Sequence, residues 1–317
     1  MRRFTKAILV CAAIVVVPMP LSAQDQRDGA APTDIPEEDQ RDPATDPDES
    51  QIIVRGGRPE EVSRSDVQRQ ARAIAGTGDV YDRPLARFED PLCPGIIGLA
   101  ADQASLIIDR VRDIAVDLDL RLQDDGCDAN FIIMFTPDSR STLRGMMDRQ
   151  PALFQFHDAG EKREMLAPGP ARVFTVVRPR TRDGMAVGQA RDLTNPPVLS
   201  TAMAHSKIYT AIRYDITSVT VMLDTDAVKG KSLNQLADYA AMRGLAQTRP
   251  IDDPAMDSIL TLFDAEAPPM HMTRFDLAYL RSVYEWIPNL PAITRINGVN
   301  RQLRKLDEEL DERDAER

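Results

Sequence analysis

A run of small and apolar side chains at residues 233–247 constrains the fold more than any other part of the chain. Residues 216–223 are rich in strand-forming side chains, and a turn separates them from this run. Ser232 stands three residues before Gln235, which is the spacing of a capping box and indicates the start of a helix. Small residues at helical spacing suit a helix that packs closely against a sheet. The stripe is Leu233, Leu236, Ala237, Ala240 and Gly244.

Hydrophobic periodicity predicts further elements on both sides of this strand and helix. We expect helices at 98–121, 139–149, 255–263 and 273–285, and strands at 130–136 and 172–177. This order predicts an α+β domain over residues 84–290. Its mixed sheet would pack against the N-terminal helix and the 233–247 helix, with C-terminal helices following. A charged helix over 291–317 is expected to dock on the domain and to fray after Leu310.

The N-terminus has the pattern of a secretory signal peptide. Three basic residues precede an apolar stretch at 7–17, and Leu21-Ser22-Ala23 follows before the composition turns acidic. We expect a signal peptide over residues 1–23, cleaved between Ala23 and Gln24. No later stretch reaches the roughly 18 consecutive apolar residues of a membrane helix. The mature protein is therefore expected to be periplasmic or secreted, with no transmembrane anchor.

Residues 24–83 are predicted to be an acidic, largely disordered tether. The first half is rich in Asp, Glu, Pro and Gln, and such a segment buries too little surface to offset its ordering entropy. Loss of the three basic residues of the signal peptide lowers the net charge from -11 to -14. This acidity argues against nucleic acid and anionic membranes as partners.

Two cysteines follow the predicted signal peptide, Cys93 and Cys127. In an oxidising compartment a nearby pair joins readily, so we expect a disulfide that encloses the 98–121 helix. No histidine stands near either cysteine, which disfavours a zinc site. Cys11 lies inside the signal peptide behind the bulky Val10, where a lipoprotein signal carries a small residue, so simple cleavage is favoured over lipidation.

The run 233–247 resembles the active-site helix of zincin metalloproteases of the metzincin type, whose signature is HExxHxxGxxH. Aligning the glycine of that signature on Gly244 places Ala237 and Ala241 at the two helical histidine positions. Asp238 then stands where the glutamate would be, and Gln247 where the third histidine would be. The resemblance implies a zincin-like fold with a degenerate site. It also implies no zinc peptidase activity, because alanine cannot ligate Zn²⁺ and no metal-bound water would meet Asp238.

The resemblance continues downstream of the helix. Residues 257–263 are similar to the methionine turn of metzincins, with Leu260 in place of methionine, and residues 273–284 are similar to the closing helix. The same run also resembles uncharacterised secreted bacterial proteins that share Ala-Asp-Tyr, Ser-Ile-Leu and Phe-Asp-x-Ala-Tyr-Leu motifs. An unrelated α+β domain with an ordinary buried helix is the competing interpretation.

These patterns predict a catalytically inactive protein with a binding or scaffolding role in the cell envelope, an unknown protein or peptide partner, and no cofactor. One alternative is a hydrolase that uses a non-zinc site around Asp238. Another is periplasmic metal handling by Met270-His271-Met272, since thioether and imidazole ligands suit Cu(I). The remaining histidines, His157 and His205, are distant in sequence, and no nucleophile motif occurs.

Overall fold

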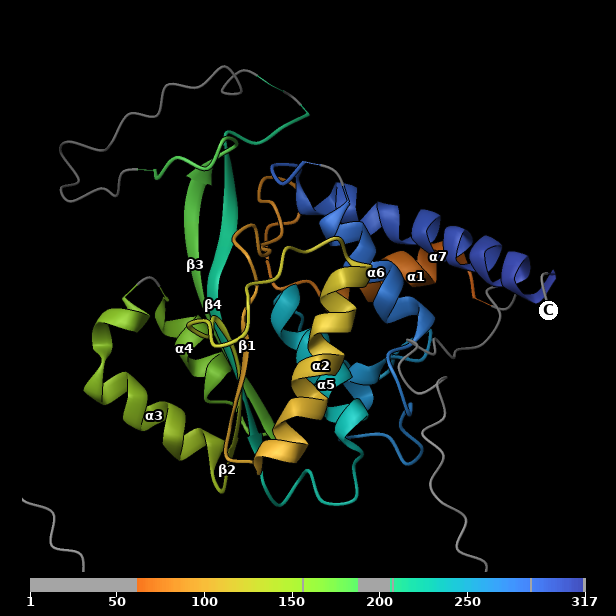
Figure 1. Cartoon of the computed structure of the whole chain (residues 1–317). Coiled ribbons are helices and arrows are strands. Elements are labelled where there is room, and N and C mark those ends of the chain that lie inside the picture. Colours follow the sequence, from red (N-terminus) through yellow and green to blue (C-terminus); the bar gives the residue numbers. More distant parts are fainter. Residues whose placement is uncertain (1–61, 156, 188–205, 207, 286, 316–317) are drawn as a thin grey trace, which may run out of the picture. The chain divides into compact units, whose positions relative to one another are not determined.

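The computed structural model describes residues 62–155, 157–187, 206, 208–285 and 287–315. They form an α+β arrangement of seven α-helices and one four-stranded mixed sheet (Figure 1). The helices are α1 (Arg64–Ala73), α2 (Ala101–Asp117), α3 (Ser139–Arg149), α4 (Ala159–Met165), α5 (Leu233–Leu245), α6 (Arg274–Tyr284) and α7 (Ala292–Ala315). The predicted α+β class and mixed sheet are confirmed. The predicted cleavage site at Ala23 and Gln24, the tether up to residue 61, and His205 lie outside the described residues.

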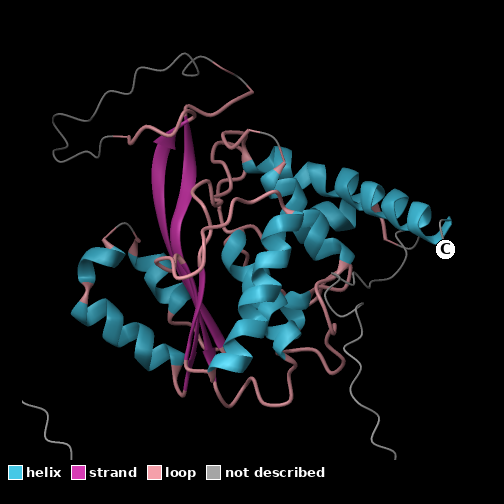
Figure 2. Ribbon diagram, viewed as in Figure 1, coloured by secondary structure: helices cyan, strands magenta, loops and turns pink. Residues whose placement is uncertain are grey.

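The sheet has the strand order β1-β2-β4-β3. Its strands are β1 (Pro94–Ile97), β2 (Phe131–Thr136), β3 (Ala171–Thr181) and β4 (Ile212–Asp224). β1, β2 and β4 run parallel, whereas β3 is antiparallel to β4 and forms one edge of the sheet. Helices cover both faces (Figure 2). Alternate side chains of a strand point to opposite faces, which explains the pattern in β2: Phe131 and Ile133 enter the larger core, and Met134 packs on the smaller one.

The larger core lies between the sheet and α1, α2, α5, α6 and α7, and the smaller core lies beneath α3. α5 begins with the predicted capping box, in which Ser232 and Gln235 bond each other's backbone. Gly244 brings this helix unusually close to the sheet. A Cβ at that position would lie 2.6 Å from Cε2 of Phe131 and 3.4 Å from Cγ1 of Val219, so only glycine fits without displacing them.

The predicted start of the domain at residue 84 is too late. α1 packs against α7, and its Val67 and Ala71 lie in the larger core together with Ile74, which follows the helix. The Gln70 amide exchanges two hydrogen bonds with the Met256 backbone, at 2.9 and 2.8 Å. The sequence offered little indication that α1 belongs to the domain, because the apolar stripe of this helix is narrow and its other faces carry arginine and aspartate.

Two other predictions near the C-terminus have different outcomes. The helix expected at 255–263 is wrong: that region contains only a 3₁₀ turn at Ile259–Thr261, held by hydrogen bonds to Asp276. The C-terminal helix docks on α6 and α1 as expected, with Ile296, Val299 and Leu303 buried. It does not fray after Leu310 but continues to Ala315. No helix in the described residues is long and apolar enough to cross a bilayer.

The predicted disulfide between Cys93 and Cys127 is present, with the two Cα atoms 6.2 Å apart. Cys93 precedes β1 and Cys127 lies in the loop before β2, so the bridge encloses α2. The disulfide therefore links the segments that lead into β1 and β2, which are neighbouring parallel strands.

We expect the double variant Cys93→Ala/Cys127→Ala to lose about 3 to 4 kcal/mol in free energy of unfolding, because the bridge closes a long loop in the unfolded chain. Urea unfolding measures this loss. The wild-type chain in excess reductant should unfold with the same midpoint as the double variant. Equal midpoints for the oxidised and reduced wild-type chains would contradict the prediction.

Candidate functional site

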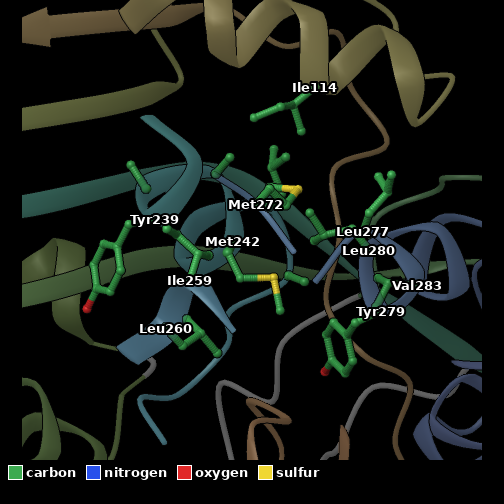
Figure 3. Close-up of a cluster of buried hydrophobic side chains, with 14 of the residues drawn as sticks. Ile114, Tyr239, Met242, Ile259, Leu260, Met272, Leu277, Tyr279, Leu280 and Val283 are labelled. Carbon is green, nitrogen blue, oxygen red and sulfur yellow. The ribbon is translucent and has the colours of Figure 1, made fainter. Parts of the chain in front are cut away.

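The helix aligned with the zincin signature is enclosed by the protein. Every residue of α5 from Gln235 to Leu245 is buried, and Ala237 and Ala241 have no exposed surface. Figure 3 shows the surroundings: Tyr239 and Met242 of α5 lie among Ile114, Ile259, Leu260 and Met272. The two positions aligned with zinc-binding histidines are therefore core positions, packed by apolar side chains.

Asp238 belongs to a buried ion pair. Nε of Arg110 donates a hydrogen bond to Oδ1 of Asp238 at 2.7 Å, and Nη2 of Arg110 donates one to Oδ2 at 3.1 Å. The Met272 backbone N–H also donates to Oδ2, at 2.6 Å. Asp238 is fully buried and Arg110 is 6% exposed. The carboxylate thus joins α2, α5 and the segment before α6, and it has no access to a substrate in solution.

The Met270-His271-Met272 tripeptide does not present its two thioethers together. Met272 is fully buried in the larger core, whereas Met270 is exposed and its sulfur lies 3.6 Å from the Gln235 amide nitrogen. His271 is partly buried. Across the described residues, no group of three or more His, Cys, Asp or Glu side chains is arranged to hold a metal ion.

Ser258 and Asp276 form a second buried polar cluster that the sequence did not reveal. The Asp276 carboxylate accepts the Ser258 hydroxyl at 2.6 Å, the Ile259 N–H at 2.8 Å, and the N–H and hydroxyl of Thr273 at 2.9 and 2.8 Å. Burial raises the pKa of Asp276 to about 6, and these bonds oppose the shift. Neither Ser258 nor Asp276 has exposed surface, so the pair fixes the 3₁₀ turn against α6.

A groove of about 750 Å³ borders the edge strand β3 and the C-terminal end of α5. We call it the β3 groove. The groove is lined by residues 76–78 and 83–86, by α4 and the preceding residues Leu153 and His157, by residues 171–179 of β3, and by residues 243–250. Gln247, aligned with the third zincin histidine, lines it with a left-handed backbone (φ 50°). The backbone of Gln247 packs closely against Gly76. A Cβ at residue 76 would lie 2.2 Å from the Gln247 carbonyl oxygen, so only glycine permits this close approach.

The outer side of β3 carries only local contacts in the described part of the chain. β4 occupies its inner side over the full length of the strand. On the outer side, Nε2 of His157 lies 3.1 Å from the Thr175 carbonyl oxygen, and the Val187 N–H bonds the Pro179 carbonyl oxygen at 3.4 Å. Alternation along the strand then directs the backbone groups of Val173 and Val177 outward as well. Pro179 within β3 is itself typical of an edge strand.

A second hollow, of about 780 Å³, lies between α2, α6 and α7. Charged side chains that already pair with each other line it. Arg281 contacts Asp117 and Glu309, both at 2.9 Å. We consider the β3 groove the better candidate, because it borders the outer side of β3, which makes only local contacts among the described residues.

Arg243 lies at the base of α5 and lines the β3 groove with a buried positive charge. In the sequence, the only indication that Arg243 is unusual is its position as a single charged residue within Ala-Ala-Met-Arg-Gly-Leu. The groove itself had no such signal, because it forms from segments distant in the chain.

Comparisons with protein-family models, with curated proteins and with solved structures found no match for this chain.

Proposed function

We propose that this chain is an exported, zincin-like protein whose former metal site is filled by core packing, and that it binds a protein or peptide partner in the cell envelope. The observation that carries the proposal is the β3 groove beside a strand edge that makes only local contacts among the described residues. An extended polypeptide can add to such an edge, with backbone hydrogen bonds supplying affinity and flanking pockets selecting side chains.

Three features support this proposal. The groove volume falls within the range of ordinary ligand sites. The disulfide suits an oxidising compartment such as the periplasm or the exterior. The sealed surroundings of Ala237, Asp238 and Ala241 disfavour the alternative of a hydrolase centred on Asp238, because neither substrate nor water reaches that carboxylate.

Selection from a library of displayed random heptapeptides tests the proposal. We expect peptides retained by the wild-type chain to slow hydrogen exchange at the Val173, Thr175 and Val177 amides. The variant Gly78→Trp should retain them at least 10-fold less. Gly78 lines the groove and a Cβ there meets no atom within 4 Å, so the indole can enter the groove without disturbing the core.

Leu106→Trp is the matched control, because Leu106 is 57% exposed on α2 and does not line the groove. It should retain peptides as the wild type does. Equal retention by wild type and Gly78→Trp, or exchange protection confined to other elements, would overturn the proposal.

A further inference from the structure

The Arg243 side chain is 8% exposed, yet no carboxylate in the described residues lies within ion-pair distance of its guanidinium. Nη1 donates to the Tyr239 hydroxyl at 2.8 Å, and the guanidinium carbon lies 5.7 Å from the Tyr239 ring centroid. Nε is buried and has no hydrogen-bond partner among the described residues. A guanidinium carries five N–H donors, so most of its bonding capacity remains unused.

Two other buried arginines, by contrast, lie beside carboxylates of the protein. Arg110 pairs with Asp238, and Arg274 contacts Asp307. An unpaired buried charge costs several kcal/mol, which an anion placed beside it would offset. Arg243 differs from these residues in that it lines a groove, so such an anion can arrive from outside.

The charges around the groove favour an anionic ligand. Arg83, Arg172 and Arg249 line it together with Arg243, against Glu161 and Glu164. Both glutamates are engaged: Glu161 accepts the Asp158 N–H at 2.9 Å in a capping box, and Glu164 receives Nε of Arg249 at 2.9 Å. The groove is thus locally basic in a chain whose net charge is -11.

We propose that the β3 groove recognises an acidic peptide, whose carboxylate pairs with Arg243 while its backbone lies along β3. The inference rests on the proposed function, because it assigns the chemistry of the same ligand. A planar guanidinium receives a carboxylate through two parallel hydrogen bonds, which gives selectivity as well as affinity. Nε and the unused Nη2 form the edge of the guanidinium suited to this arrangement.

Two heptapeptide pools test the inference, both acetylated and amidated, with the central residue fixed as Glu in one and as Gln in the other. We expect the wild-type chain to retain the Glu pool at least 10-fold more than the Gln pool. Arg243→Met, which preserves the packing against Tyr239, should remove that preference, and Arg243→Lys should keep part of it. A Gln pool with a free C-terminus shows whether a terminal carboxylate serves equally.

The outcomes separate this inference from the proposed function. Pools retained no better by the wild type than by Gly78→Trp would overturn both. Equal retention of Glu and Gln pools, together with Gly78→Trp sensitivity, would overturn the carboxylate pairing alone. So would a Glu preference that persists in Arg243→Met. Should Arg243→Met fail to fold, the Nε–H of Arg243 in the wild type is the second measurement: a retained Glu peptide should slow its exchange, and an unchanged rate would overturn the pairing.

Discussion

Asp238→Ala is expected to lower the free energy of unfolding by about 3 to 5 kcal/mol, because it leaves the Arg110 guanidinium buried without its counter-ion. The Met272 N–H also loses its acceptor. Urea unfolding followed by circular dichroism measures the change. Asp109→Ala is the matched control on α2: Asp109 is exposed, and its substitution should alter stability by no more than about 0.5 kcal/mol.

The double variant Arg110→Met/Asp238→Leu distinguishes two causes of destabilisation. One is the cost of leaving the Arg110 charge buried without a counter-ion, and the other is the loss of the ion pair itself. Replacing both charges with apolar side chains removes the desolvation cost of each, so the pair should be less destabilised than Asp238→Ala alone. An Asp238→Ala chain within about 1 kcal/mol of the wild type would contradict the buried-pair account. Asp238 would then again be a candidate for chemistry.

Placing histidines at the two positions aligned with the zincin ligands, by Ala237→His/Ala241→His, is expected to destabilise the chain by about 2 to 6 kcal/mol, since each imidazole must displace packed core atoms. Both alanines are fully buried, and each new ring would also need hydrogen-bond partners in an apolar environment. Unfolding midpoints measure the loss, and metal analysis after dialysis against zinc measures binding. We expect no stoichiometric zinc.

Arg304→His/Glu308→His places the same pair of side chains four residues apart on the exposed face of α7. This control should retain the wild-type stability, which separates the effect of the histidines from the effect of their location. One zinc per chain bound by the core pair without loss of stability would show that the α5 face opens more readily than its packing implies.

Much of the fold follows from local sequence signals. A short apolar run rich in strand-forming residues predicts β2, and the Ser232/Gln235 spacing predicts where α5 begins. The cysteine pair was also predictable, because it stands on either side of a single predicted helix. In each case the information lies within a few residues or within one helix-strand unit.

The remaining features depend on partners far away in the chain. Arg110 and Asp238 are 128 residues apart, and each interrupts an apolar stripe with a charge. Opposite charges on two buried helical faces were the available signal for their pairing. The failure at 255–263 has the same origin, because the Asp276 carboxylate and not local propensity sets the conformation of that turn. The β3 groove required the strand order, which no local pattern supplies.

The packing of α1 against α7 ties the beginning of the folded region to its end, with the Asn300 amide donating to the Arg64 carbonyl oxygen at 3.1 Å. A chain that emerges from its N-terminus cannot complete the larger core until Leu303 is available. If export proceeds as proposed, α1 would wait unpaired while more than 200 residues follow it across the membrane. Under that proposal, the larger core would be completed only when transport is almost finished.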